Sequence, residues 1–242
     1  MRLKRKQGFY EKYIKRLLDI GCSAFFITLF CWLYAIIAII VRIKMGSPVL
    51  FKQPRPGIVK NGKETIFDMY KFRTMTDERD DQGDLLPDEQ RLPKFGAMLR
   101  STSLDELPEV FCILRGTMSI VGPRPQLVRD MVFMSDRQRM RHTAKPGLTG
   151  LAQVNGRNAV SWEEKLEWDL KYIEHVSFVN DVKIVLDTVA TVFKRLGITD
   201  GENATSLDYG DALLRDGKVS KEKYDALQAL ARNLIIDHEG RR

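Results

Sequence analysis

Residues 20–41 read IGCSAFFITLFCWLYAIIAIIV, a run of 22 positions without a charged side chain. As an α-helix this run would be ~33 Å long, which is enough for a bilayer hydrocarbon core of about 30 Å. A buried core helix is one alternative, but such helices are usually shorter and carry a polar stripe. A cleaved signal peptide is another, but no A-x-A-like site follows. The run therefore predicts a membrane-embedded helix near the N-terminus.

Basic residues flank this run on both sides. Residues 1–16 contain seven Lys or Arg and one Glu, and four more Lys or Arg lie between residues 42 and 55, before the next acid at Glu64. Basic flanks favour the cytoplasmic side of a membrane, so a helix that dips in and returns fits better than a straight span. Such a break usually needs Pro, Gly or polar residues, and the middle of the run reads Phe30-Cys31-Trp32. The basic flanks therefore favour a helix that re-enters the membrane, whereas the residues at the middle of the run do not favour a bend.

The remaining sequence has the composition of a folded protein. The chain has 242 residues, of which 44% are hydrophobic and 29% charged, and this excludes wholesale disorder. The three cysteines form no C-x-x-C pair, which excludes a zinc finger or a disulfide scaffold. Three scattered histidines make no histidine-built metal site.

Periodicity predicts an α+β fold that is mostly helical. Residues 48–53 and 65–73 read as two strands of a small β-hairpin with its turn at Asn61-Gly62, and the acidic stretch 77–89 reads as a loop. Helices are expected at about 92–100, 104–114, 125–141, 162–176, 179–196 and 221–236. The apolar stripe of helix 179–196 is explained first by core packing and second by docking on a membrane surface.

Several familiar motifs are absent or incomplete. Residues 57–64 read GIVKNGKE, which nearly matches a phosphate-binding P-loop but ends on Glu64 instead of a hydroxyl. The stretch also lies between two predicted strands, so it reads as a hairpin turn. The sequence has no G-x-G-x-x-G, H-E-x-x-H, G-x-S-x-G or D-x-D motif.

A pair of carboxylates, Asp105 and Glu106, follows Ser103 in the pattern of an S-x-x-E capping box. Such a pair often does no more than stabilise a helix N-terminus. If Asp105 lies in a first helical turn, the helix dipole should keep its pKa below the usual value of about 3.9. An ionised carboxylate in that place is a candidate nucleophile at phosphorus or a ligand for Mg²⁺.

Cationic side chains gather on or near loops rich in Gly and Pro. One such cation alone is usually a solvated surface residue, whereas several on stiff loops indicate a polyanion site, with a diphosphate as the natural ligand. The candidates for this phosphate and substrate site are Lys71, Arg73, Arg100, Arg124, Lys145 and Arg157.

Six motifs in order resemble one known family. They are PVLFKQPRPG (48–57), YKFRTM (70–75), RSTSLDELPEV (100–110), GTMSIVGPRP (116–125), KPGLTGLAQVNGRN (145–158) and SFVNDVKI (177–184). From about residue 10 to about residue 200 the chain resembles the bacterial monotopic phosphoglycosyl transferases, also called bacterial sugar transferases. It is most similar to the small members that consist of the catalytic domain alone.

The resemblance implies a fold and a domain division. It implies a re-entrant N-terminal helix and amphipathic helices on the membrane surface. The expected parts are a basic tail and membrane helix (1–45), a catalytic domain (46–200) and a polar C-terminal extension with one helix (201–242). The family usually bends its membrane helix at a Ser-Pro pair, where Cys31-Trp32 stands here, and Lys145 replaces the Arg that begins its R-P-G-x-T-G motif.

The resemblance also implies an activity. It implies transfer of a sugar 1-phosphate from a UDP-sugar to a polyprenol phosphate, undecaprenyl phosphate, with release of UMP at the cytoplasmic face of the cytoplasmic membrane. Asp105 and Glu106 would be the catalytic pair, with Asp105 as nucleophile and as a ligand of the cofactor Mg²⁺. Arg124 would bind phosphate, and Asp181 matches an acidic position in the site region. The implied partners are the UDP-sugar, the polyprenol phosphate and membrane lipid.

Two rival readings differ in class. The first is a non-catalytic membrane-surface scaffold whose basic tail binds anionic lipid, in which Asp105 is only a helix cap. The second is a nucleic-acid-binding protein, prompted by a pI of about 9.3. No nucleic acid is expected as a partner, because the excess charge adjoins an apolar helix and no recognition motif is present.

Overall fold

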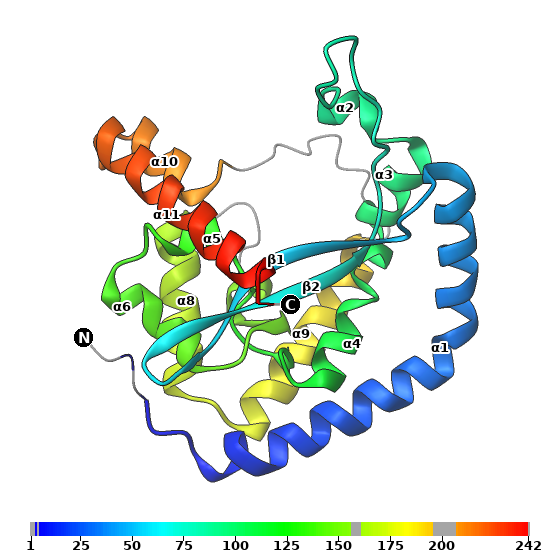
Figure 1. Cartoon of the computed structure of the whole chain (residues 1–242). Coiled ribbons are helices and arrows are strands. Elements are labelled where there is room, and N and C mark those ends of the chain that lie inside the picture. The colour runs from blue at the N-terminus through cyan, green and yellow to red at the C-terminus, as the bar shows by residue number, and fades with distance from the viewer. Residues whose placement is uncertain (1–2, 4, 156–160, 196–206, 242) are drawn as a thin grey trace. The chain divides into compact units, whose positions relative to one another are not determined.

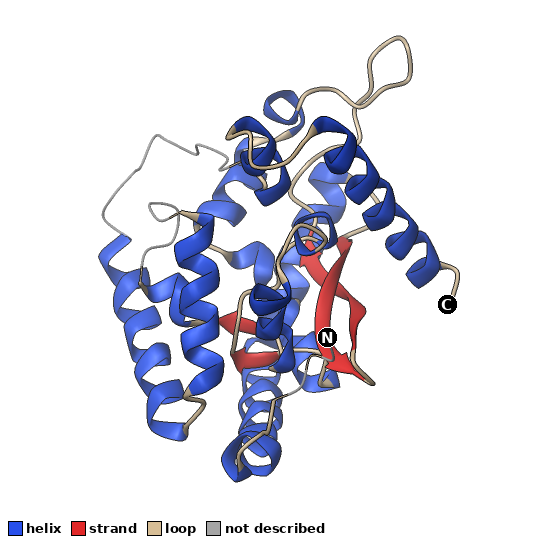
Figure 2. Ribbon diagram, turned by 90° about the vertical axis from the view of Figure 1, so that its left-hand side faces the viewer, coloured by secondary structure: helices blue, strands red, loops and turns tan. Residues whose placement is uncertain are grey.

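A computed structural model describes residues 3, 5–155, 161–195 and 207–241 (Figure 1). The chain forms two compact units. Unit 1 contains Met1–Asp19, Pro54–Phe67 and Gly116–Arg242, and unit 2 contains Ile20–Gln53 and Asp68–Arg115. Most described residues are helical, with two small pairs of strands (Figure 2), so the α+β prediction is confirmed.

The predicted membrane run forms a long helix. A short π-helical turn, η1 (Tyr10–Ile14), leads into α1 (Lys15–Met45). The stretch Tyr10–Met45 is long and apolar enough to cross a membrane, and only 11% of its most apolar window is buried. The buried-core alternative is therefore wrong. Large apolar side chains that protein does not cover need another apolar environment, which a bilayer supplies.

Helix α1 bends partway along its length (Figure 1). In its apolar run, the hydroxyl of Thr28 donates to the carbonyl of Ala24 at 2.9 Å, and the indole N–H of Trp32 donates to the carbonyl of Leu29 at 3.1 Å. Side chains that bond to helix carbonyls in this way offer them partners besides the regular ladder and commonly bend helices. The run thus contains polar donors near its middle even though it has no proline.

Unit 2 is built on the second half of α1. It also contains four short helical segments: α2 (Asp88–Arg91), α3 (Lys94–Ser101), η2 (Leu104–Glu106) and α4 (Glu109–Arg115). Ile37 and Val41 of α1 form a buried cluster with Phe72 and Leu99. The opposite side of α1 exposes apolar side chains at helical spacing, namely Phe25, Leu29, Trp32, Ile36, Ile39 and Ile43.

The predicted hairpin is present and longer than expected. It consists of β1 (Leu50–Lys60) and β2 (Lys63–Phe72). Asn61 and Gly62 both have positive φ, 52° and 79°, as the tight turn of a two-residue hairpin requires. The turn prediction is confirmed. The P-loop-like stretch 57–64 forms the end of β1, this turn and the start of β2. The proline-containing stretch at 54–57 belongs to β1, which a two-stranded sheet tolerates because each strand has a free edge.

Unit 1 holds a second sheet that the sequence did not predict. Strand β3 (Ser119–Val121) pairs in parallel with β4 (Gly147–Thr149), with Ser119 opposite Gly147 and Val121 opposite Thr149. Both strands have only three residues, too short for a periodic signal. Val121 contributes to a core with Leu170, Tyr172 and Ile184.

Long helices of unit 1 match their predictions, while the predicted helix 125–141 is wrong. Helices α8 (Trp162–Glu174) and α9 (Phe178–Arg195) lie where expected, and α7 (Leu151–Val154) is a short addition. The stretch 125–141 is instead divided into α5 (Val128–Met131), α6 (Asp136–Arg139) and η3 (Met140–Thr143). Ser135 starts α6 anew through a capping box with Gln138.

The apolar stripe of α9 is mostly not core. Val185 packs against the buried core of unit 1, but Val182, Leu186, Val189 and Val192 are exposed. Core packing as the explanation of this stripe is therefore wrong for these residues, and Leu196 lies outside the described residues.

The C-terminal extension contains two helices in place of the one predicted. Helices α10 (Tyr209–Arg215) and α11 (Lys221–Glu239) both belong to unit 1. Ala231 of α11 is buried with Val128 and Met131 of α5, and Tyr209 of α10 is buried with Met134 and Leu166.

Candidate active site

The carboxylate pair lies in the short helical turn η2 of unit 2. Ser103, before it, has a left-handed φ of 56° and makes no side-chain cap hydrogen bond. The predicted capping box is therefore wrong, because the chain turns sharply at Ser103 and the α-helix begins only at Glu109. Asp105 is consequently held by a tight turn and not by the first turn of a long helix.

Burial dominates the electrostatics of Asp105. The residue is only 9% exposed. Burial raises the pKa of this carboxyl above its usual range, and the neighbouring Glu106 adds to the rise, while Lys71 and Arg100 oppose it. The expected lowering of the Asp105 pKa is therefore wrong, because loss of hydration outweighs the nearby positive charge. An ionised carboxylate with little hydration is a reactive nucleophile.

Lys71 connects the carboxylates of this turn. Its ammonium donates to Oε1 of Glu106 at 2.7 Å and lies 3.2 Å from Oε1 of Glu109. Glu109 is buried, and the sequence reasoning missed it. Its spacing of three residues from Glu106 was the available signal, because residues at i and i+3 share a helix face. Lys71 thus holds Glu106 beside Asp105.

Arg100 is one of the cations that lower the pKa of Asp105, whereas Arg73 hydrogen-bonds to two loops. Nε of Arg100 donates to the hydroxyl of Thr74 at 3.0 Å. The buried guanidinium of Arg73 donates to the carbonyls of Met75 and Ser47, each at 2.9 Å, and pairs with Asp77. These contacts stabilise the loops around β2, and substrate binding by Arg73 stays a prediction.

In unit 1, the GPRP motif (122–125) and the KPGLTG motif (145–150) meet backbone to backbone. A Cβ added to Gly122 would lie 2.3 Å from the carbonyl oxygen of Lys145, and one added to Gly150 would lie 2.1 Å from the carbonyl oxygen of Gly122. Such approaches exclude any side chain. The glycines of the two motifs are therefore required for the close contact between the segments that carry Arg124 and Lys145.

Lys145 stands in a cationic environment. It is partly buried, and this burial lowers the pKa of its ammonium. Arg16 and other nearby cations lower it further, while Asp19 opposes them. An anion bound here would relieve the repulsion among these cations.

Asp181 lies in a buried hydrogen-bond network of unit 1. Its carboxylate accepts hydrogen bonds from Tyr10 at 2.8 Å, from Lys15 at 2.5 Å and from Tyr172 at 2.9 Å. These contacts join the start of the N-terminal helix to α8 and α9. A substrate-binding role for Asp181 stays a prediction, and Arg157 lies outside the described residues.

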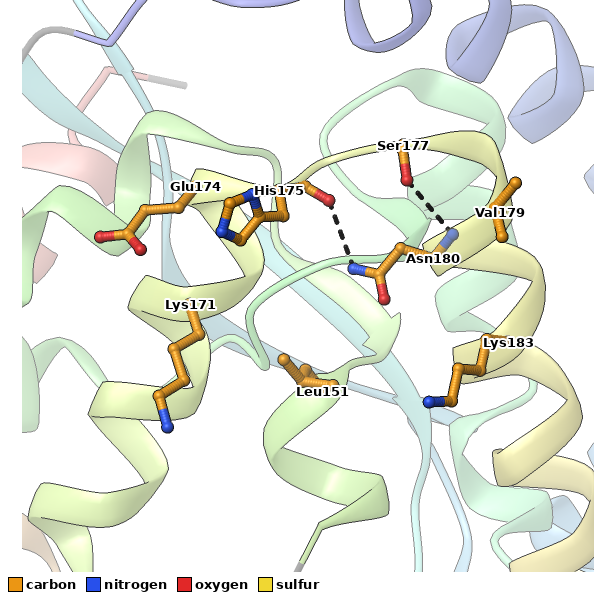
Figure 3. Close-up of a pocket in the computed structure, with 8 residues that line it drawn as sticks. All are labelled: Leu151, Lys171, Glu174, His175, Ser177, Val179, Asn180 and Lys183. Carbon is orange, nitrogen blue, oxygen red and sulfur yellow. Dashed lines mark hydrogen bonds between the residues drawn. The ribbon is translucent and has the colours of Figure 1, made fainter.

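The same unit has a pocket of about 590 Å³ at the turn between α8 and α9 (Figure 3). Lys171 and Lys183 lie on its two sides, and Asn180 donates to the carbonyl of His175 at 3.4 Å. None of its lining residues is a predicted site residue. Most of them are exposed, which is typical of a surface recess.

Comparison with known proteins identifies the class and then the family. The sequence model of the bacterial sugar transferases matches residues 10–195. The chain is therefore a transferase. It belongs to the bacterial sugar transferase family, as the sequence motifs predicted.

Individual relatives agree with this family. The chain is 47% identical over 193 residues to an uncharacterized sugar transferase, EpsL, of Bacillus subtilis, covering 80% of this chain and 94% of that protein. It is 40% identical over 185 residues to a UDP-glucose:undecaprenyl-phosphate glucose-1-phosphate transferase of Klebsiella pneumoniae, covering 72% of this chain but 39% of that protein. A third relative, the UDP-N-acetylgalactosamine-undecaprenyl-phosphate N-acetylgalactosaminephosphotransferase of Aeromonas hydrophila, is 34% identical over 76% of this chain and 45% of its own length. The chain thus spans less than half the length of these two larger relatives.

Proposed function

We propose that this protein is a phosphoglycosyl transferase that moves a sugar 1-phosphate from a UDP-sugar to undecaprenyl phosphate and releases UMP. Relatives named for this reaction support the substrate classes. The observation that carries the chemistry is the buried Asp105, adjacent to Glu106 and with Lys71 close by. The proposal places the enzyme at the first membrane step of glycoconjugate synthesis.

The reaction proceeds through a covalent intermediate. A carboxylate oxygen of Asp105 attacks the β-phosphorus of the UDP-sugar, and the bond from that phosphorus to the bridging oxygen breaks. UMP leaves with the electron pair. A phosphate oxygen of undecaprenyl phosphate then attacks the same phosphorus and restores the Asp105 carboxylate. Two displacements of this kind make the kinetics ping-pong.

Further residues orient the reacting groups in this scheme. Lys71 holds Glu106 in place, and Glu106 positions Asp105 or handles a proton. Arg124, whose planar guanidinium suits bidentate contact with phosphate, binds the diphosphate.

Mg²⁺ fits this donor set. It binds proteins through one or two carboxylates together with substrate phosphates and water. Asp105 would supply one such carboxylate, and the diphosphate would supply further oxygens. When bound, the ion neutralises charge that develops on the phosphate oxygens.

The proposed location is the cytoplasmic face of the bacterial inner membrane, with α1 re-entering the bilayer. Three features support it: basic residues on both flanks of the apolar run, the exposed apolar surface of α1, and its bend. UDP-sugars are made in the cytoplasm, so the donor would be available on that side.

The covalent step is tested without the lipid acceptor. Purified enzyme with Mg²⁺ and a panel of UDP-sugars should release up to one UMP per enzyme molecule, and the trapped phosphosugar should map to the peptide that contains Asp105. Asp105→Asn should abolish both signals, because an amide is a far poorer nucleophile. Active enzyme that gives intersecting double-reciprocal plots and no labelled peptide would instead indicate direct attack by the lipid phosphate.

Membership of the sugar transferase family argues against the non-catalytic scaffold, and Asp105 offers a direct test. Under that reading Asp105 stabilises a turn only, and Asp105→Asn leaves function intact. Turnover of any UDP-sugar in the panel by the purified wild-type protein, lost in Asp105→Asn, would exclude it.

A further inference from the structure

The backbone of the GPRP segment (122–125) is bonded to fixed partners along its length. The N–H of Gly122 donates to the carbonyl of Thr149 at 2.9 Å, and the carbonyl of Pro123 accepts from the N–H of Gly147 at 3.0 Å. The third carbonyl, that of Arg124, accepts from Nη2 of Arg141 at 2.5 Å. The carbonyl of Pro125 accepts from Nη1 of Arg55 at 3.1 Å. The carbonyl of Arg124 is therefore fixed by a side chain and not by the sheet.

Arg141 is fully engaged in the protein interior. It is 1% exposed, and so is Asp169, its ion-pair partner on α8. Nε and Nη2 of Arg141 donate to Oδ2 of Asp169 at 2.9 and 2.6 Å. Nη1 lies 3.3 Å from Nε2 of His142. Each nitrogen of this guanidinium thus has a fixed partner.

The network continues to the β-hairpin. Because arginine only donates, Nε2 of His142 is the acceptor, so the ring carries its proton on Nδ1, which faces Glu64 at 3.5 Å. Burial lowers the pKa of His142 to about 4, which keeps the ring neutral at neutral pH. Glu64 of β2 in turn accepts two hydrogen bonds from Arg139, at 2.5 and 2.7 Å. A chain of polar groups therefore runs from β2 to the carbonyl of Arg124.

Stability is a weak explanation for this buried pair. Taking two charges out of water costs free energy that their attraction often fails to offset, and apolar replacements of similar volume are frequently neutral or stabilising. The cost is offset best when all lone pairs are satisfied. Oδ1 of Asp169 is buried without a hydrogen-bond partner in the described part of the chain. Geometry is the better explanation, since the pair fixes the orientation of one backbone carbonyl.

We propose that Arg141 and Asp169 are positioning residues that orient Arg124 toward the diphosphate of the donor. This inference rests on the proposed role of Arg124. Arg141 touches no substrate in this scheme, and acts through the peptide unit from which the Arg124 side chain leaves the loop.

The test replaces the pair by apolar side chains. The double variant Arg141→Met with Asp169→Leu keeps the interior filled but removes the hydrogen bond to Arg124. We expect Tm to remain near that of the wild type and the Kd for UDP, measured by calorimetry on the full-length protein in detergent, to rise about 10-fold, a loss of ~1.4 kcal/mol. Wild-type affinity for UDP in the folded double variant would overturn the inference.

A matched control exists on the same two segments of chain. Arg137 of α6 pairs with Glu167 of α8, and both side chains are exposed. Arg137→Gln with Glu167→Gln should leave both Tm and UDP affinity unchanged. If the apolar double variant does not fold, Arg141→Lys gives the same information, because one ammonium cannot reproduce the fork that reaches both Asp169 and the Arg124 carbonyl. Wild-type UDP affinity in Arg141→Lys would then contradict the inference.

A double-mutant cycle separates positioning from general structural damage. Arg124→Lys retains the charge but loses the planar fork, and by itself should weaken UDP binding about 10-fold. If Arg141 and Asp169 act through Arg124, adding their replacement to Arg124→Lys should cause little further loss. Additive losses would contradict the inference. Wild-type affinity in Arg124→Lys alone would instead remove the proposed role of Arg124, and the inference with it.

Discussion

At the scale of single residues, the pKa of Asp105 depends on a balance between burial and charge. Burial pushes the pKa of Asp105 up, and Lys71 is the strongest of the groups that push it down. Lys71 also bonds to Glu106. One lysine therefore controls both the ionisation of the proposed nucleophile and the position of its neighbour.

Removing that lysine should change the pH dependence of the reaction. In the proposed reaction, attack requires ionised Asp105, so activity should be lost as the pH falls through the pKa of this carboxyl. Lys71→Met removes the opposing charge and should raise that pKa, moving the acid limb of the kcat/KM profile to higher pH by about one unit. The measurement is UMP release as a function of pH. Lys94→Met, at an exposed position of α3, is the control, and an acid limb that coincides in the two variants would contradict the role of Lys71.

A single methyl group at Gly122 should disrupt the contact between the GPRP segment (122–125) and the KPGLTG segment (145–150) of unit 1. In Gly122→Ala the new Cβ would lie 2.3 Å from the carbonyl oxygen of Lys145, a backbone atom that cannot move alone. We expect a loss of about 1–3 kcal/mol in the free energy of unfolding, and hence a fall in Tm of several degrees. Gly8→Ala is the control, since nothing lies within 4 Å of its Cβ position. Equal Tm values for the two variants would show that the loops adapt.

At the scale of elements, α1 combines an apolar surface with basic flanks. Its exposed face carries Phe25 and Leu29 in the first half and Trp32, Ile36 and Ile39 in the second. Both halves therefore need apolar surroundings. In the proposed topology, a bent helix meets this need and both of its ends lie on one side of the membrane.

The topology is testable with introduced cysteines. In a chain whose three native cysteines are replaced by serine, Lys6→Cys and Lys60→Cys report the two sides of α1. We expect neither variant to react with a membrane-impermeant thiol reagent in intact cells, and both to react after permeabilisation. Reaction of Lys6→Cys alone in intact cells would mean that α1 spans the membrane.

At the scale of the whole molecule, the C-terminal extension is part of the core of unit 1. The match to the bacterial sugar transferases ends at residue 195. Beyond it, the backbone N–H of Tyr209 donates to Asp130 at 2.9 Å, and Ala231 is buried with Val128 and Met131. The extension therefore covers apolar surface on the helix that follows the GPRP motif.

Two adjacent positions on α11 test this packing. Ala231 is 1% exposed and Leu230 is 48% exposed. Ala231→Asp buries an unpaired charge and should lower the free energy of unfolding by about 2 kcal/mol or more, whereas Leu230→Asp should change it by less than about 0.5 kcal/mol. Thermal unfolding measures both. Equal Tm values would mean that α11 contributes little to the stability of the unit.

Patterns that extend over many residues were predicted correctly from the sequence. The apolar run of α1, the Asn61-Gly62 turn, and helices α8, α9 and α11 follow from local periodicity and turn chemistry, which act within a few residues. The six motifs also identified the family. The short parallel pair of β3 and β4 and the breaks between α5, α6 and η3 were missed, because a three-residue strand has no period and a single capping serine outweighs helical spacing.

The sequence by itself determined the apolar helix, the hairpin, the family and the identity of Asp105 and Glu106 as the proposed reacting pair. Only the tertiary structure decided the shift in the Asp105 pKa, because the burial that raises it depends on how distant parts of the chain pack together. It also decided that Arg73 and Asp181 are bonded within the protein, and that Arg141 bonds to Arg124 across 17 residues. Burial and long-range hydrogen bonds join residues far apart in sequence, and no local pattern records them.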